Sequence, residues 1–328
     1  MKPFKNTNNI PVVFASDSKY ASYLEVTLKS AVDKFSKDYN YDIIILENNI
    51  GEKNKKRLLK LSKENISIRF FDITKAIQDE DKFYISNHIS TATYYRLFIP
   101  EILKEYKKII YLDIDLLILE DLSKLYNVDM GDNLIAAALD LPLHIKYLND
   151  EDFEYKKFRD YLKQELNIKD GNSYFQAGVL VMNLEQMRKD NITQKSIEIL
   201  NSGKKFILHD QCILNKLCHG KVHYISNSWD SYKLNIEKLL YNNQRKSYMT
   251  SIKSPKIVHF TGQGSKKAWN GYMSNKWAWV WNYKSLSLDN GIFLYSKLFL
   301  ERLNKTLKRE LYRRVHLTNS TVKLMYFK

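Results

Sequence analysis

The chain has 328 residues, of which 44% are hydrophobic and 13% aromatic, with ten glycines and five prolines. This composition predicts an ordered globular protein with an adequate core, and no apolar run approaches the roughly 18 residues of a membrane span. The net charge of +15 favours phosphate groups or an anionic membrane as partners, because no zinc-ligand or RNA-binding motif supports nucleic acid.

Short apolar runs alternate with amphipathic segments along the first part of the chain. Such alternation predicts an α/β fold with a parallel sheet of the nucleotide-binding type. The expected strands are Ile10–Ser16, Tyr41–Leu46, Ile66–Phe71 and Ile109–Leu112, and the expected helices are Tyr20–Phe35, Lys53–Glu64 and Thr91–Leu103.

No glycine-rich phosphate loop follows the first expected strand. Asp17-Ser18-Lys19-Tyr20 stands there instead, so neither the dinucleotide-binding fingerprint nor the Walker loop applies. If the protein binds a diphosphate, it must therefore rely on a metal ion and basic side chains.

The second part of the chain continues the same alternation. Further strands are expected at Leu116–Leu119, Leu134–Leu139, Ala177–Val181 and Lys256–Phe260, and further helices at Ile192–Asn201 and Asp210–Leu217. From Ile292 to Val315, apolar residues recur at helical spacing with Arg and Lys between them, which is typical of a basic amphipathic helix. No linker divides the chain before about residue 285, so we expect one domain over 1–285 and a basic helical extension over 286–328.

An acidic pair, Asp113-Ile114-Asp115, follows the expected strand Ile109–Leu112. Ligands bind at the carboxyl ends of such strands, and unpaired buried carboxylates are heavily penalised, so a divalent metal ion holding a diphosphate is a candidate occupant. The alternative is a pair of turn or helix-capping aspartates. The same D-x-D pattern occurs at residues 79–81 and 150–152, but those copies lie in polar segments and are expected to be solvated loop charges.

Six segments, in this order along the chain, resemble glycosyltransferase family 8. The family includes bacterial lipopolysaccharide galactosyl- and glucosyltransferases and glycogenin, and the resemblance covers about residues 10–282. The segments are VVFASDSKYASYLEVTLKS, ISTATYYRLFIPEIL, IIYLDIDLLILEDL, YFQAGVLVMNLEQMR, LHDQCILN and HFTGQGSKKAW. The resemblance implies a GT-A fold, a Rossmann-like mixed sheet flanked by helices, and a retaining enzyme that uses a UDP-sugar with Mn²⁺ or, alternatively, Mg²⁺.

The resemblance also implies a metal site made of Asp113, Asp115 and His259. A mixture of carboxylate and imidazole ligands suits Mn²⁺ better than Ca²⁺, which prefers oxygen alone. The alternative for His259 is a hydrogen-bonded histidine at the end of a buried strand.

Two residues match the family's glycine and lysine beside the diphosphate, namely Gly262 and Lys267. Glycine lets the backbone approach the phosphates, and the ammonium group supplies a point charge. The insertion Gln263-Gly264-Ser265 lengthens the family's usual spacing, which leaves Lys266 as an alternative to Lys267.

The remaining donor-binding positions are also carried over from the family. Asp17 matches the residue that reads the uracil edge, with a simple helix N-cap as its alternative. Arg96 matches an arginine near the donor sugar and phosphate, with a surface ion pair as its alternative. Gln176 matches a residue around the donor sugar, where some relatives have asparagine.

The expected catalytic residues are Asp140, Asp210 and Gln211. The two aspartates can accept hydrogen bonds from sugar hydroxyls, although turn or helix-cap roles are the alternatives. Gln211 matches the residue nearest the anomeric carbon, on the face opposite the leaving group. Because an amide is a poor nucleophile, we favour front-face substitution through an oxocarbenium-like ion pair.

The predicted function is transfer of a hexose, glucose or galactose, from a UDP-sugar to a saccharide or glycolipid acceptor in cell-surface glycan or lipopolysaccharide synthesis. The alternative is a catalytically inactive nucleotide-sugar-binding protein. The sequence leaves the identity of the hexose and the oligomeric state open.

The predicted location is cytoplasmic. Cys212 and Cys218 lack metal-type spacing and are expected to be ordinary thiols in a reducing compartment, and Ile10–Ala15 is too short for a signal-peptide core. Some bacterial family members end in a basic, aromatic membrane-contacting segment. We therefore expect the tail after Ile292 to contact the anionic inner face of the cell membrane, with a helix packed on the domain as the alternative.

Overall fold

The computed structural model describes residues 1–75, 77, 91–148, 153–169, 173–234, 242–262, 267–270, 276–286 and 288. The chain divides into two compact units, Met1–His259 and Phe260–Lys328. The amphipathic segment Ile292–Val315 lies outside the described residues, so its contact with a membrane and the predicted division at residue 285 stay predictions. Among the described helices, none is long and apolar enough to span a membrane.

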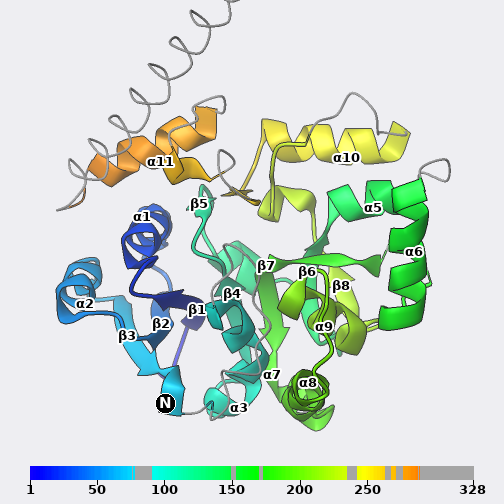
Figure 1. Cartoon of the computed structure of the whole chain (residues 1–328). Coiled ribbons are helices and arrows are strands. Elements are labelled where there is room, and N and C mark those ends of the chain that lie inside the picture. Colours follow the sequence, from blue (N-terminus) through cyan, green and yellow to red (C-terminus); the bar gives the residue numbers. More distant parts are fainter. Residues whose placement is uncertain are drawn as a thin grey trace, which may run out of the picture. The chain divides into compact units, whose positions relative to one another are not determined.

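The first unit is built on a seven-stranded sheet with the order β3-β2-β1-β4-β7-β6-β8 (Figure 1). A separate two-stranded sheet pairs β5 with β9. The strands are β1 (Asn9–Asp17), β2 (Asn40–Asn48), β3 (Ile66–Asp72), β4 (Lys108–Leu112), β5 (Leu116–Ile118), β6 (Ile135–Leu139), β7 (Phe175–Asn183), β8 (Val222–Tyr224) and β9 (Ile257–His259). Every strand expected from the sequence is therefore present, and β8 is an addition.

The sheet is mixed, which corrects the parallel sheet that the helix–strand alternation predicts and agrees with the GT-A expectation. β1, β2, β3 and β4 pair in parallel, whereas β7 runs antiparallel to both of its neighbours, β4 and β6. The helices between β6 and β7 return the chain at the end of the sheet where β6 finishes, so β7 runs antiparallel to β6. A parallel neighbour would need a crossover connection to the opposite end of the sheet.

Helices of the first unit flank the sheet (Figure 1). They are α1 (Ala21–Val32), α2 (Glu52–Leu59), α3 (Ile99–Ile102), α4 (Ser123–Tyr126), α5 (Leu141–Leu148), α6 (Phe153–Leu166), α7 (Leu184–Lys189), α8 (Ile192–Asn201), α9 (His209–Cys218) and α10 (Asn242–Lys253), with the 3₁₀ turns η1 (Ile73–Lys75), η3 (Thr91–Phe98) and η5 (Asn227–Trp229). The expected helices at α1, α8 and α9 are confirmed, and α2 ends earlier than expected.

The predicted helix over Thr91–Leu103 is wrong in type. Residues Thr91–Phe98 form the 3₁₀ segment η3, and only Ile99–Ile102 are α-helical. Pro100 lies in the first turn of α3, where proline is tolerated. A continuous α-helix is disfavoured here because Pro100 has no amide hydrogen to donate to the carbonyl four residues earlier, and its ring crowds that carbonyl.

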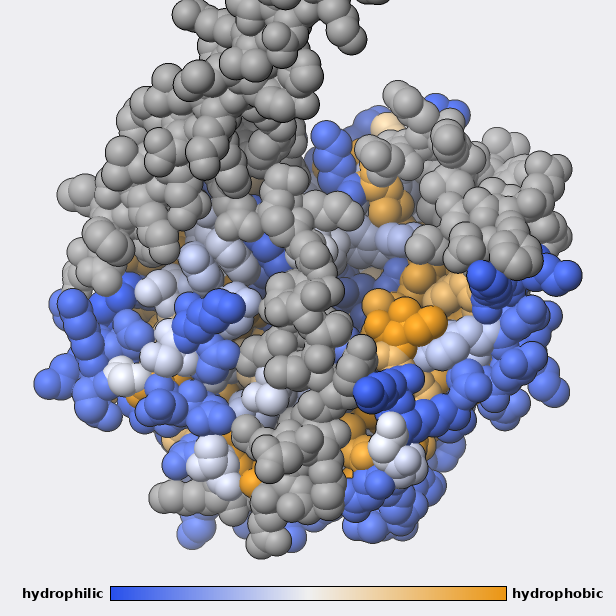
Figure 2. Space-filling view, viewed as in Figure 1, coloured by the Kyte–Doolittle hydropathy of each residue, from blue (hydrophilic) through white to orange (hydrophobic). Residues whose placement is uncertain are grey.

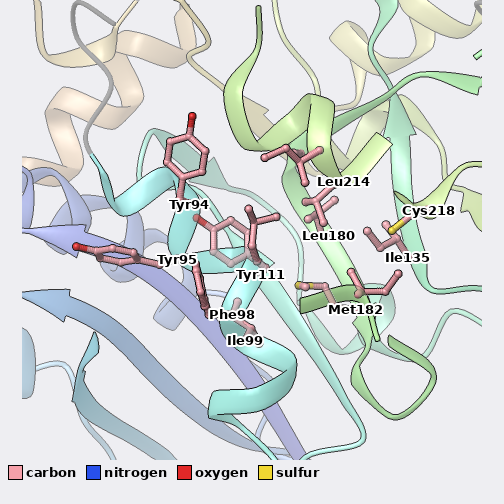
Figure 3. Close-up of a cluster of buried hydrophobic side chains, with 14 of the residues drawn as sticks. Tyr94, Tyr95, Phe98, Ile99, Tyr111, Ile135, Leu180, Met182, Leu214 and Cys218 are labelled. Carbon is pink, nitrogen blue, oxygen red and sulfur yellow. The ribbon is translucent and has the colours of Figure 1, made fainter. Parts of the chain in front are cut away.

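Buried side chains form one core on each face of the sheet. Along β1, Val12 and Phe14 face the core beneath α1 and α2, whereas Val13 and Ala15 face the core that includes η3 and α9. This alternation is expected of a strand covered on both faces. Figure 3 shows part of the second core, including Tyr111, Leu180 and Leu214. On the face seen in Figure 2, the described surface is mainly hydrophilic.

The described part of the second unit contains η7 (Ala268–Asn270) and α11 (Lys276–Leu286). Asn282 joins them, because its side-chain Nδ2 donates to the carbonyl oxygen of Ala268 at 2.9 Å. The rings of Trp269 and Trp281 also lie in contact, with centroids 5.8 Å apart. These contacts make η7 and α11 one packed element.

Helix α1 anchors the segment that carries the acidic pair. The buried Thr27 hydroxyl lies within hydrogen-bonding distance of the carbonyl oxygens of Ile114 and Leu116, 2.9 Å from the latter. One turn later, the Ser30 hydroxyl accepts a hydrogen bond from the Ile118 amide at 2.9 Å. The backbone on both sides of Asp115 is therefore fixed by side chains of a helix.

We expect Thr27→Val to lower the free energy of unfolding by about 1–3 kcal/mol, because it leaves buried carbonyl oxygens without a donor. Urea unfolding measures this loss. Thr27→Ser is the matched control, since it keeps the hydroxyl and should lose less. Equal losses in the two variants would contradict the proposed anchoring.

Candidate active site

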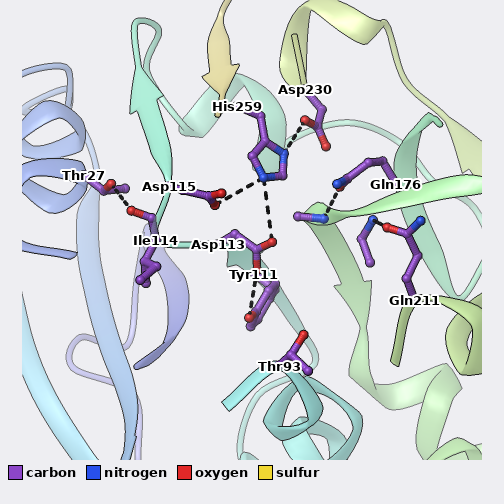
Figure 4. A network of polar contacts seen from close by, with 12 residues as sticks. Thr27, Thr93, Tyr111, Asp113, Ile114, Asp115, Gln176, Gln211, Asp230 and His259 are labelled. Carbon is purple, nitrogen blue, oxygen red and sulfur yellow. Dashed lines mark hydrogen bonds and ion pairs between the residues drawn. The ribbon is translucent and has the colours of Figure 1, made fainter. Parts of the chain in front are cut away.

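Polar side chains from several elements meet at one edge of the large sheet (Figure 4). Asp113 follows β4, and Gln176 lies near the start of β7, which is antiparallel to β4, so both residues are at the same end of this strand pair. His259 ends β9 and is paired with Leu116 of β5, directly after Asp115. Chain segments far apart in sequence are thus brought together by strand pairing.

Asp113, Asp115 and His259 form a cluster of side chains that could bind a metal ion. One ligand atom from each residue can be chosen so that all lie within 4.8 Å of one another. Nε2 of His259 is 3.2 Å from Oδ1 of Asp115 and 3.9 Å from Oδ2 of Asp113. Two carboxylates and one imidazole are ligands that Mn²⁺ accepts, so the donor set fits the metal that the family resemblance implies.

The imidazole of His259 is buried and lies between acidic groups. Its Nδ1 is 2.8 Å from Oδ1 of Asp230, on the side away from Asp115. Burial alone would lower the pKa of His259, but the charges of Asp115 and Asp230 outweigh it and raise the pKa to about 10. Without a metal ion, a protonated imidazole therefore supplies the positive charge between the carboxylates.

Gly178 makes room for this imidazole. A Cβ atom at residue 178 would lie 2.2 Å from Cε1 of His259 and 2.9 Å from its Nδ1. The carbonyl oxygen of Gly178 also accepts a hydrogen bond from the Asp113 amide at 2.8 Å. Gly178 was not among the residues predicted from the sequence, although a glycine inside a strand often marks a close approach of another group.

Arg96 links the metal-type cluster to Asp210. Its guanidinium is 2.8 Å from Asp113 and 2.9 Å from Asp210, and it stacks over the ring of Tyr111 at 4.3 Å. Burial alone would lower the pKa of Arg96, but Asp113 and Asp210 outweigh it and move that pKa above its usual range. Arg96 and Asp210 are both buried and Asp113 is partly buried, so neither ion pair is the surface pair considered as the alternative.

The predicted catalytic residues lie beside this link. Gln211 receives a hydrogen bond from the Ala177 amide at 3.0 Å and donates to Asp140 at 2.9 Å. Asp210 accepts from the Thr93 hydroxyl at 2.6 Å. Burial raises the pKa of Asp210, and Arg96 only partly offsets this effect.

The other predicted donor-binding residues are not members of the Asp113, Asp115 and His259 cluster. Asp17 ends β1 and accepts a hydrogen bond from the Tyr20 amide at 3.1 Å, so its carboxylate supports the turn before α1, whose N-cap residue is Tyr20 and not Asp17. The side-chain oxygen of Gln176 accepts from the Gly178 amide. Gly262, with φ of +88°, and Lys267 belong to the second unit, and their roles beside a diphosphate stay predictions. Lys266 lies outside the described residues.

Comparison with known proteins identifies the family. The sequence matches the glycosyl transferase family 8 profile over residues 11–272, which is most of the chain. General stress protein A of Bacillus subtilis (strain 168) is 29% identical over 268 residues, which cover 79% of this chain and 87% of that protein.

Solved structures of glycosyltransferases share the fold. The galactosyltransferase LgtC, in complex with donor and acceptor sugar analogs, matches with a TM-score of 0.69 at 27% identity, covering 85% of this chain and 96% of that chain. The apo structure of the bifunctional glycosyltransferase WbbM matches with a TM-score of 0.77 at 28% identity, covering 90% of this chain and 52% of that chain. The present chain thus spans about half of WbbM, and its mixed sheet flanked by helices is of the GT-A type.

We expect Gly178→Ala to lower the free energy of unfolding by about 1–3 kcal/mol, because the added methyl group must displace the imidazole of His259. Urea unfolding in the absence of metal measures the loss. Gly51→Ala is the matched control, since Gly51 has φ of −62° and no atom within 4 Å of a built Cβ. A Gly178→Ala protein as stable as the control would contradict the tight fit.

Proposed function

We propose that this chain, which belongs to glycosyltransferase family 8, is a metal-dependent retaining hexosyltransferase. It moves glucose or galactose from a UDP-sugar to a saccharide or glycolipid acceptor, in the synthesis of a cell-surface glycan or lipopolysaccharide. The main support is the convergence of Asp113, Asp115 and His259 from two distant parts of the chain. The match to LgtC, whose structure holds donor and acceptor sugar analogs, supports binding of both substrates.

In this proposal, Asp113, Asp115 and His259 hold the metal ion. A bound Mn²⁺ would bind the diphosphate of the donor and neutralise the negative charge that develops on departing UDP. Oδ1 of Asp113 already binds Arg96 and Tyr111, at 2.8 and 3.2 Å. Its Oδ2 is therefore the oxygen that is left to face the metal site.

Gln211, Asp140 and Asp210 act on the donor sugar. The hydrogen bonds from Ala177 and to Asp140 fix which end of the Gln211 amide is oxygen and which is nitrogen. A fixed amide can support positive charge at the anomeric carbon but is a poor nucleophile. We therefore propose front-face substitution, in which the departing phosphate accepts the proton of the acceptor hydroxyl and the acceptor enters from the same side.

Release of UDP tests this function. The protein should hydrolyse UDP-glucose or UDP-galactose when Mn²⁺ is present and stop when the metal is chelated. Asp115→Asn should lower this rate by about 100-fold or more, because it removes one proposed metal ligand. Asp33→Asn is the matched control, since Asp33 pairs with Lys29 at the exposed end of α1.

The outcomes separate the two candidate functions. Metal-dependent UDP binding without any turnover would favour the inactive nucleotide-sugar-binding protein. Equal activity in Asp115→Asn and Asp33→Asn would contradict the proposed metal site.

The front-face proposal predicts that no glycosyl group becomes attached to Gln211 or Asp210. Intact-protein mass spectrometry after incubation with donor and Mn²⁺ should show only the unmodified mass. Proton NMR of the transfer product should show the anomeric configuration of the donor. A trapped hexosyl adduct on either side chain would replace the proposal with double displacement.

A further inference from the structure

Asp230 is a fully buried carboxylate that the sequence analysis did not select. It directly follows η5 and has a relative exposure of 0%. Its Oδ1 contacts Nδ1 of His259 at 2.8 Å, and its Oδ2 has no hydrogen-bond partner among the residues that the structure describes. A buried carboxylate is costly unless it interacts with a charged or hydrogen-bonding group, and this imidazole supplies that interaction for Asp230.

The contact decides how the two ring nitrogens of His259 are used. Nδ1 faces Asp230, and Nε2 faces Asp115 and Asp113 (Figure 4). A carboxylate at Nδ1 keeps the proton on that nitrogen, so that Nε2 is the nitrogen that can donate a lone pair to a metal ion.

The backbone keeps Asp230 and His259 together. The Ser231 amide donates to the Ile257 carbonyl at 3.0 Å, and the His259 amide donates to the Ser231 carbonyl at 2.8 Å. Gly178 lies against the ring, where a Cβ atom would overlap it. The imidazole is thus confined by a short strand pairing, a glycine and a carboxylate from three separate parts of the chain.

We propose that Asp230 is a positioning residue that presents Nε2 of His259 to the metal ion and so sets a preference for Mn²⁺ over Mg²⁺. This inference rests on the proposed function, because it requires that the Asp113, Asp115 and His259 cluster binds a divalent cation. Mg²⁺ prefers oxygen ligands and retains its water, whereas Mn²⁺ gains more from an imidazole nitrogen. Loss of a carboxylate that orients a histidine ligand typically weakens metal binding about 10–100-fold.

Metal titrations of the full chain test the inference without relying on activity. Free Mn²⁺ is measured by electron paramagnetic resonance, and Mg²⁺ binding by its competition with Mn²⁺. Asp230→Ala should weaken Mn²⁺ binding about 10–100-fold and Mg²⁺ binding less than about threefold. Asp230→Asn, which keeps the shape of the side chain, should show an intermediate loss if its oxygen still faces Nδ1.

Two further measurements distinguish positioning from general damage. Electron spin-echo modulation by the imidazole nitrogen should be present in wild-type protein with Mn²⁺ and weakened in Asp230→Ala. In a His259→Ala background, Asp230→Ala should have no further effect on Mn²⁺ binding, because the two residues act as one unit. Asp42→Asn is the matched control: Asp42 is also fully buried, but its partners are Arg69, Tyr106 and the Phe4 amide.

The result that would overturn the inference is a wild-type affinity for Mn²⁺ in Asp230→Ala, or equal losses for Mn²⁺ and Mg²⁺. An undiminished effect of Asp230→Ala in the His259→Ala background would overturn it as well. If wild-type protein binds neither metal, the proposed metal site itself is wrong. That outcome differs from one in which wild-type protein binds Mn²⁺ and only the role of Asp230 is wrong.

Discussion

The site is governed by repulsion between acidic groups that the fold forces together. Asp113 and Asp115 follow a buried strand, and their ligand atoms lie within 4.8 Å. Two unit charges at that separation repel each other by about 3–4 kcal/mol at an effective dielectric constant of about 20. Positive groups must therefore stand beside them, and the structure supplies Arg96 and His259.

These two cations do not balance the acids around them. Within the described part of the chain, the carboxylates paired with Arg96 or His259 are those of Asp113, Asp115, Asp210 and Asp230, so four acidic groups surround two basic ones. Even with His259 protonated, the group carries a formal excess of two negative charges. A divalent cation would bring two positive charges and, on binding, would displace the proton from Nε2 of His259, so the formal excess would fall from two negative charges to one. The charge count and the ligand geometry thus favour the same occupant.

Sequence patterns predict the parts of this arrangement that are local. Apolar runs identify every strand that carries a site residue, and the D-x-D pair directly follows one of them. The direction of β7 is not local, because it depends on how α5 and α6 return the chain to the sheet. The apolar pattern of Thr91–Leu103 resembles that of one helix and gives no sign that the segment divides into the 3₁₀ segment η3 and the short helix α3. Asp230 has no sequence signal at all, since its role arises only from the pairing of Ser231 with β9.

Family resemblance assigns separate roles to Asp113 and Asp210, one toward the metal and one toward the sugar, but the structure couples them. Arg96 contacts both carboxylates and lies over Tyr111, which itself donates to Asp113. Because Arg96 and Tyr111 both use Oδ1 of Asp113, this carboxylate is held in one orientation by groups on η3 and β4. A change at either aspartate would leave a buried guanidinium partly unpaired, which is costly. The metal-facing and sugar-facing halves of the site therefore form one electrostatic unit, whose geometry is set by rigid elements of the fold.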